Sequence, residues 1–210
     1  MEGIEIVNPG DIEKRSFEIL SEILGPREFP PAHGPIIKRV IHTTADFDYA
    51  DNLKISPFAV ETAMEALKSG CGIVTDTKMA AAGINKKALS SYGGQVRCFM
   101  DDEAVAAEAK EKNVTRASIC MERAAEDVNN RIFAIGNAPT ALIRLYELVM
   151  EKKISPALVI GVPVGFVNVV EAKELFKKAG VPYIISEGRK GGSNVAAAIV
   201  NAILYMAPKA

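Results

Sequence analysis

Short apolar runs alternate along this chain with longer stretches in which apolar residues recur every three or four positions. The short runs are rich in β-branched residues, a composition that predicts strands buried on both faces of a sheet. The longer stretches predict amphipathic helices. Alternating strands and helices are typical of a mainly parallel sheet that helices cover on both faces. We therefore predict a three-layer, Rossmann-like α/β fold.

The pattern predicts six strands and seven helices, with a proline-rich stretch from 25 to 35 after the first helix. The predicted strands are 36–42, 72–75, 95–99, 131–135, 157–162 and 183–186. The predicted helices are 9–24, 57–68, 101–112, 116–127, 138–152, 169–179 and 193–206. The sequence contains no internal repeat, low-complexity tract or long polar linker, so we expect residues 1–210 to form one domain.

Charge and composition exclude several classes of protein. The chain has 25 basic and 26 acidic residues, and this balance argues against a nucleic-acid partner. No apolar run approaches the ~20 residues that span a membrane, and the N-terminus lacks the layout of a signal peptide. Three scattered cysteines, Cys71, Cys98 and Cys120, favour a reducing compartment. We expect a cytoplasmic protein without a membrane partner.

Polar or glycine-rich segments follow the predicted strands. Because the carboxyl ends of parallel strands meet at one edge of a sheet, we expect these segments to surround a single large crevice. Four polar side chains in them, Thr75, Thr77, Asn137 and Thr140, are candidates to bind a ligand there. The five segments are 42–48, 75–79, 136–140, 161–168 and 188–194.

The segment 189–193 contains two cations, two glycines and a hydroxyl. Arg189 and Lys190 carry the charges, Gly191 lets the backbone approach a ligand closely, and Ser193 precedes a predicted helix. These features fit a cradle for a carboxylate or phosphate. They also fit a solvated turn in which Ser193 caps the helix. The spacing is neither that of a Walker loop nor that of a G-x-G-x-x-G fingerprint.

His42 is the candidate for proton transfer, because histidine exchanges a proton near neutral pH. It lies at the end of a predicted strand, with Asp46 and Asp48 close in sequence to orient it, whereas His33 lies in a proline-rich connection. A structural histidine, with the two aspartates as turn residues, is the plainer alternative. The sequence has neither a nucleophile elbow nor metal-ligand spacing, so we predict no metal site. An acid–base isomerase fits these residues best.

Six motifs, in the same order along most of the chain, resemble those of the precorrin-8X methylmutases, a family that includes the cobalt-precorrin-8 methylmutases of the anaerobic cobalamin pathway. Residues 43–48 resemble the anaerobic members more closely. The six motifs are IEKRSF at 12–17, RVIHTTADFD at 39–48, TDTKM at 75–79 with Gly83-Ile84, AIGNAPTAL at 134–142, GVPVGFV at 161–167 and GRKGGS at 188–193.

This resemblance implies an isomerisation without a cofactor, in which a methyl group of a corrinoid precursor migrates from C-11 to C-12 and gives a cobyrinic acid type product. Any cobalt is carried by the substrate. By resemblance, His42 is the catalytic histidine that protonates a ring nitrogen and takes the proton back, while Ser16 and Arg39 match substrate-contact positions. A hydroxyl and a fork of N–H donors suit the carboxylate groups that edge such a macrocycle.

The resemblance also implies a homodimer with sites near the subunit interface, and it leaves open a direct hand-over of product to the next enzyme of the pathway. The alanine-rich helix at 195–206 fits either subunit packing or a cover over the sheet. Two other classes stay open. A non-catalytic corrinoid carrier needs the same crevice without an acid, and a phosphate-ligand enzyme would use the helix start at 191–193.

Overall fold

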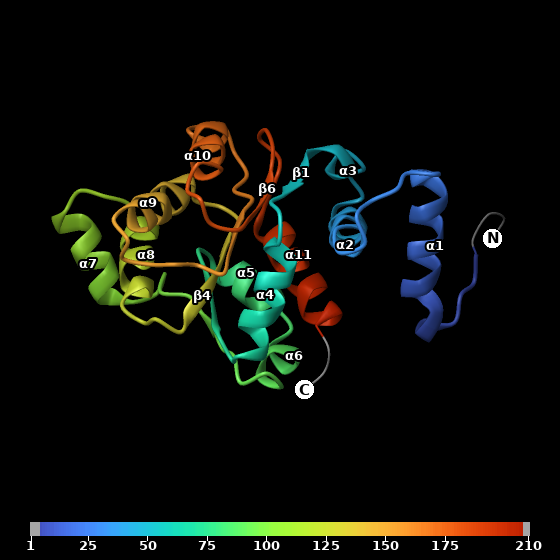
Figure 1. Ribbon diagram of the computed structural model, residues 1–210, viewed down its shortest axis with the longest axis horizontal. Coiled ribbons are helices and arrows are strands. Elements are labelled where there is room, and N and C mark those ends of the chain that lie inside the picture. The colour runs from blue at the N-terminus through green and yellow to red at the C-terminus, as the bar shows by residue number, and fades with distance from the viewer. Residues whose placement is uncertain (1–4, 208–210) are drawn as a thin grey trace.

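A six-stranded sheet forms the middle layer of the computed structural model, which describes residues 5–207 (Figure 1). The strand order is β1-β6-β5-β4-β2-β3, and all neighbouring strands are parallel except β1, which runs antiparallel to β6. The strands are β1 (Leu53–Ile55), β2 (Gly72–Thr75), β3 (Val96–Arg97), β4 (Asn130–Ile135), β5 (Leu158–Gly161) and β6 (Tyr183–Ser186).

Helices cover both faces of this sheet, as the sequence predicts. Alternate residues of β4 face opposite layers: Ile132 packs in one core cluster and Phe133 in the other. The first layer contains α2 (Gly34–Thr44), α4 (Ala59–Lys68), α5 (Lys78–Gly83), α6 (Lys86–Ser90) and α11 (Ser193–Met206). The second contains α7 (Glu103–Glu111), α8 (Arg116–Ala125), α9 (Pro139–Met150) and α10 (Val169–Phe176). The α/β fold is confirmed.

The alanine-rich helix α11 covers the sheet from inside the first layer. It is buried over most of its length and packs against α2, α4 and α5. Its small side chains allow a close approach of α5, since a Cβ atom on Gly83 would lie 2.8 Å from the Cβ of Ala197. Within the described chain, α11 is therefore an internal helix.

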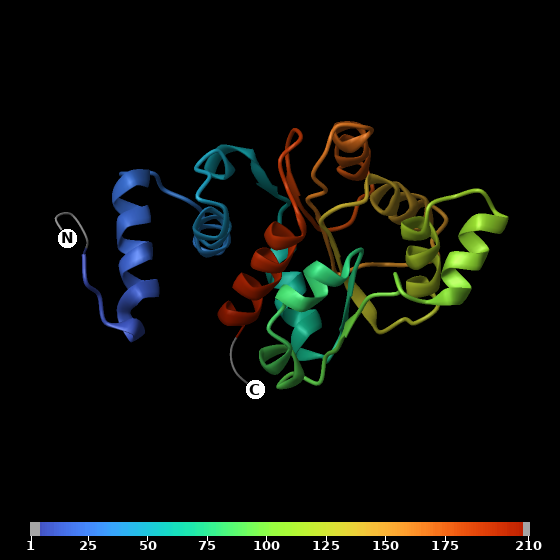
Figure 2. The ribbon, with the colours of Figure 1, turned by 180° about the vertical axis from the view of Figure 1, so that it is seen from behind.

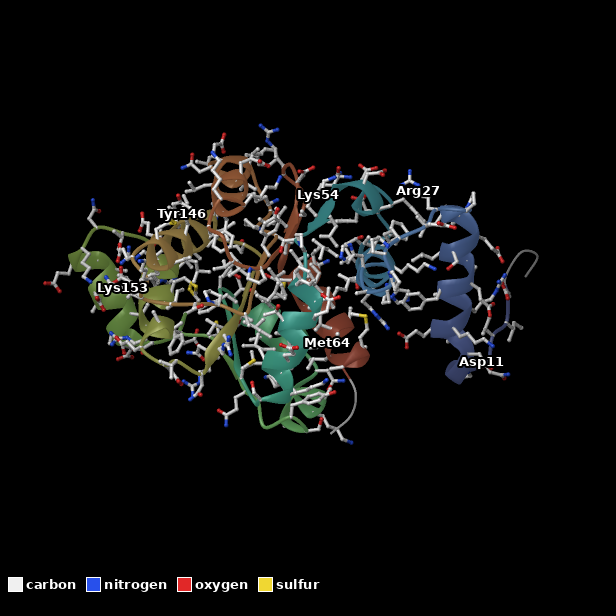
Figure 3. All side chains as sticks on the ribbon, in the orientation of Figure 1. Asp11, Arg27, Lys54, Met64, Tyr146 and Lys153 are labelled. Atoms are coloured by element: carbon white, nitrogen blue, oxygen red, sulfur yellow. The ribbon has the colours of Figure 1, made fainter. Side chains whose placement is uncertain are left out.

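The N-terminal helix α1 (Ile12–Leu24), preceded by the 3-10 turn η1 (Pro9–Asp11), lies at the outer end of the molecule, beyond α2 (Figure 1 and Figure 2). Leu20 is the buried residue of this helix, whereas Ile12 is 54% and Ile23 is 63% exposed. Arg27, in the loop that follows α1 (Figure 3), donates a hydrogen bond of 2.8 Å to Asp51. Helix α1 thus exposes an apolar surface.

The predicted strand at 36–42 is wrong, because these residues form most of helix α2. Pro35 occupies the first turn of α2, where a missing N–H is tolerated. Ile36, Ile37, Val40 and Ile41 are all buried, and their spacing places them on one helical face. Burial of that face outweighs the strand preference of β-branched residues. Consequently, His42 lies in the last turn of a helix and not at a strand end.

The other predicted strands and helices are confirmed to within a few residues, and 72–75, 183–186 and 193–206 match their elements at both ends. Four short elements have no counterpart in the prediction: α3 (Tyr49–Asn52), β1, α5 and α6. No helix in residues 5–207 is long and apolar enough to cross a membrane. Cys71, Cys98 and Cys120 are free thiols.

Candidate functional site

The buried carboxylate of Asp76 joins two of the predicted loops at the carboxyl edge of the sheet. It follows β2 and accepts hydrogen bonds from the backbone N–H groups of Gly136 at 2.9 Å, Asn137 at 2.8 Å and Ala138 at 2.7 Å. Burial raises the pKa of the Asp76 carboxyl, and the three N–H donors oppose that effect. Asp76 therefore fixes the turn between β4 and α9 against the end of β2.

The predicted residues Thr75, Thr77 and Ser193 come together beside this turn. The Thr77 and Ser193 hydroxyl oxygens lie 2.7 Å apart, and the buried Thr75 hydroxyl donates to the Thr77 carbonyl at 3.0 Å. Thr77 caps α5, whereas Ser193 is the first residue of α11 and does not cap it. A Cβ on Gly136 would lie 2.7 Å from the Ser193 Cα, so α11 begins in direct contact with the β4–α9 turn.

The loops after β5 and β6 also pack against each other. The N–H of Gly192 donates to the carbonyl of Val162 at 2.9 Å, and the N–H of Gly165 donates to the carbonyl of Arg189 at 3.2 Å. A Cβ on Gly191 would lie 2.1 Å from the Val162 oxygen, so only glycine fits there. Four of the five predicted loops, 75–79, 136–140, 161–168 and 188–194, therefore lie together at this edge. They do not surround an open crevice where they meet, because their backbones are in contact.

Two loops at this edge expose large apolar side chains. Phe166 and Val167, on the loop after β5, are 84% and 78% exposed, and Val164 on the same loop is also exposed. Met79, just after the end of β2, is another exposed apolar side chain. Large exposed apolar side chains that gather at one edge mark a surface suited to a ligand or partner. These residues give the edge exposed apolar surface beside its exposed polar side chains.

Lys190 connects the edge to the segment that follows α2. Its ammonium lies 2.7 Å from a carboxylate oxygen of Asp46 and 2.6 Å from one of Asp48. Hydrogen bonding to Lys190 lowers the pKa of Asp46, and the two carboxylates raise the pKa of Lys190. The ammonium predicted to hold a ligand is thus occupied by two acids of the chain. The aspartates, for their part, contact Lys190 and not His42.

An aromatic ring orients His42. The exposed imidazole stacks on Phe17 of α1, with ring centroids 4.9 Å apart and planes 7° from parallel. The guanidinium of Arg39 lies 4.8 Å from the centroid of the same ring and 5.5 Å from that of Tyr205. Arg39 also pairs with Glu13 and thereby lowers the pKa of that carboxyl. Phe17 therefore holds both the predicted acid and the predicted cation.

A groove of about 260 Å³ opens between α1 and α2 next to His42. Its walls are apolar except for the Ser16 hydroxyl and the His42 imidazole, so these two polar groups border one apolar space. The groove is lined by Ser16, Ile19, Leu20, Ile23, Ile41, His42, Ala45 and Phe47.

Three predicted residues take part differently. Thr140 places its hydroxyl 2.7 Å from that of Thr115, the residue that caps α8. Asn137 contributes its backbone N–H to Asp76 while its side chain is exposed, and Arg189 is also exposed.

Within residues 5–207, no group of three His, Cys, Asp or Glu side chains is arranged to hold a metal ion.

Lys173 of α10 is a residue that the sequence reasoning missed. It is fully buried, and its ammonium donates to the Ser186 hydroxyl at 3.2 Å and to the carbonyls of Gly188 and Lys190 at 2.8 and 2.9 Å. Burial lowers the pKa of Lys173 to about 8. A lysine between Ala172 and Phe176 on the apolar side of a predicted helix was the available signal.

Comparison with known proteins identifies the family of this chain. The family model described as precorrin-8X methylmutase matches residues 11–206. The cobalt-precorrin-8 methylmutase of Salmonella typhimurium is 47% identical, with 95% of this chain and 96% of that protein covered. That of Priestia megaterium is 44% identical, with 96% and 89% covered. The solved precorrin-8x methyl mutase from Thermus thermophilus superposes with a TM-score of 0.86 at 39% identity, with 94% and 97% covered.

These matches identify the chain as an isomerase, and specifically a methylmutase. The chain belongs to the precorrin-8X methylmutase family, whose members act in corrin biosynthesis.

Replacing Asp76 tests the junction at the sheet edge. An amide offers one acceptor oxygen where the carboxylate offers two, so Asp76→Asn turns an N–H donor toward a backbone N–H. We expect a loss of about 1–3 kcal/mol in the free energy of unfolding, measured by urea denaturation. The exposed Asp11→Asn, at the foot of α1 (Figure 3), is the control and should change stability by less than about 0.5 kcal/mol. Equal stability of the two variants would contradict this account.

The buried lysine predicts a pH dependence. Folding lowers the pKa of Lys173 from 10.5 to about 8, so its contribution to stability is present above about pH 10.5 and is lost as pH falls through about 8. Relative to Lys173→Met, the free energy of unfolding of the wild type should therefore rise by roughly 3 kcal/mol between about pH 7 and pH 10.5. Urea curves of both proteins across this range measure the difference, and a flat difference would refute the lowered pKa.

Proposed function

We propose that this chain moves a methyl group from C-11 to C-12 of cobalt-precorrin-8, giving a cobyrinic acid type product, with His42 as the acid and base. One observation carries the proposal: an exposed imidazole, stacked on an aromatic ring, lines an apolar groove. The names of the Salmonella and Priestia relatives favour the cobalt-bearing substrate over the metal-free one.

In this proposal His42 protonates a ring nitrogen and draws electron density from the macrocycle. The bond from C-11 to the methyl carbon breaks as the bond to C-12 forms, and the proton then returns to the imidazole. The methyl group stays on the substrate, so the reaction needs no methyl donor, oxidant or reductant, and we propose that the enzyme uses no cofactor.

A single well-placed acid contributes about 10²- to 10⁴-fold to a rate, so binding must supply the rest of the acceleration by holding the ring in a reactive shape. The exposed Phe166 and Val167 would contact the flat face of the macrocycle. Its carboxylates would reach the exposed Arg189 and the N–H groups at the start of α11. We propose that Ser16 and the remaining donors of Arg39 bind carboxylates at the α1 side.

The other predicted site residues have supporting roles in this proposal. Lys190 is held by two acids and would contribute backbone groups rather than its charge. Gly191 would keep the ligand-facing turn close to the loop after β5. Thr75, Thr77 and Asn137 would hold the loops at the sheet edge together, while Ser193 and Thr140 lie at helix starts.

We further propose a cytoplasmic homodimer in which a second copy covers the exposed apolar face of α1. Ile12 and Ile23 project from that face, and the groove beside His42 opens at the surface of the single chain. A partner there would exclude water from the groove. The free cysteines fit a reducing compartment. Product release from such a surface site would suit hand-over to the next enzyme of the pathway.

Removing the imidazole separates catalysis from binding. We expect His42→Ala to lower kcat by 10²- to 10⁴-fold and to keep its affinity for cobyrinic acid within about threefold of wild type. The measurements are turnover with cobalt-precorrin-8 and absorption titration with the product. His33→Ala is the matched control, since His33 precedes α2 without capping it, and should turn over normally. Normal turnover by His42→Ala would instead favour a carrier or a different acid.

The stacked ring is tested by Phe17→Leu, which keeps an apolar side chain but removes the plane on which His42 lies. We expect kcat to fall by about 10-fold, because misplacing a reacting group by about an ångström costs up to 10²-fold. Tyr205→Leu removes the second ring beside Arg39 and leaves the stack intact, so its kcat should be close to that of wild type. Steady-state kinetics of both variants measure the contrast, and equal effects would rule out orientation by Phe17.

A further inference from the structure

Lys173 is a buried cation that has no acidic hydrogen-bond partner among residues 5–207. It lies on the inner face of α10 with Val169, Ala172 and Phe176, and its side chain has no exposed surface. Buried lysines are rare unless they are paired. Within residues 5–207, the hydrogen-bond partners of this ammonium are one hydroxyl and two carbonyls, all neutral. Because burying an unpaired charge costs free energy, we expect a structural role of this ammonium in its hydrogen bonds.

All three partners lie at the end of β6 or in the turn that follows it. The ammonium donates to Ser186 at the end of the strand and to the carbonyls of Gly188 and Lys190. The Ser186 hydroxyl itself donates to the Lys190 carbonyl at 2.7 Å. The three N–H groups of the ammonium thus match the three acceptors of one turn, so that Lys173 closes residues 186–190 from inside.

The outer side of this turn holds the proposed corrinoid site together. The Lys190 side chain binds Asp46 and Asp48, which follow the helix that carries His42. The Arg189 carbonyl accepts a hydrogen bond from the N–H of Gly165, which lies in the loop after β5. The backbone then continues through the glycine turn, where Gly192 donates to Val162, into α11. Three loops therefore depend on the path of residues 186–190.

We propose that Lys173 is a positioning residue for substrate binding: its ammonium fixes the turn 186–190 and so holds the start of α11, the apolar loop after β5 and the segment after α2 around the corrinoid. This inference rests on the proposed function. A neutral side chain of equal length would leave the Gly188 carbonyl without its donor and the Lys190 carbonyl with the Ser186 hydroxyl alone, and the turn would open. The chemical step, which uses His42, would stay intact once substrate is bound.

The test compares Lys173→Met with Lys178→Met, an exposed lysine just beyond α10. In the ligand-free protein, hydrogen exchange at the amides of Gly165 and Gly192 reports on the two backbone contacts of the turn. We expect exchange at both to be at least about 10-fold faster in Lys173→Met than in wild type. The KM for the corrinoid substrate should rise by about 10-fold while kcat stays within about threefold. Lys178→Met should match wild type in all three measurements.

Ser186→Ala is the second variant and decides the question if Lys173→Met does not fold. It removes one acceptor of the ammonium and the link to the Lys190 carbonyl, so exchange and KM should change in the same direction by about threefold. Unchanged exchange and KM in the folded variants would overturn the proposal. So would faster exchange spread evenly over the whole chain, which marks a purely structural lysine. Failure of the wild type to convert the corrinoid would reject the proposed function. The exchange rates at Gly165 and Gly192 would still test whether Lys173 fixes the turn.

Discussion

A buried carboxylate holds the loops at the carboxyl edge of the sheet in place by accepting hydrogen bonds from backbone N–H groups. Parallel strands end at that edge without hairpins, so the loops need side chains to tie them together. Asp76 does so between β2 and β4, with three N–H donors at the start of α9. Lys173 complements it after β6, with a hydroxyl and two carbonyls as acceptors. The two buried groups do not pair with each other. Each is hydrogen-bonded to groups of the loop that it positions.

This division leaves few charges free for a ligand. Lys190 is bound by Asp46 and Asp48, and Arg39 by Glu13 and two aromatic rings. The exposed side chains at the edge are both apolar, as Phe166 and Val167 are, and polar, as Asn137 and Arg189 are. A large apolar ring with carboxylates at its rim fits such a surface better than a compact anion does. The isomerase chemistry of the family then needs one proton and a well-held ring.

The sequence predicts most of the fold and less of the site. Continuous apolar runs such as 72–75 and 183–186 follow from burial on both faces, and they match β2 and β6. The helix at 34–44 was missed because its buried β-branched residues have the composition of a strand, although their spacing is helical. The roles of Asp76 and Lys173 arise from tertiary contacts that local patterns do not encode. Likewise, Phe17 is part of a quoted motif, but its stacking on His42 joins two separate helices.

A crystal structure of the protein with its corrinoid product tests the central claim that the α1–α2 groove and the sheet edge form one site. The account predicts the macrocycle against Phe166 and Val167, with a ring nitrogen within about 2.6–3.2 Å of the His42 imidazole. It also predicts a substrate carboxylate at the start of α11. A product bound elsewhere, with His42 facing solvent and the α11 start unoccupied, would contradict the account.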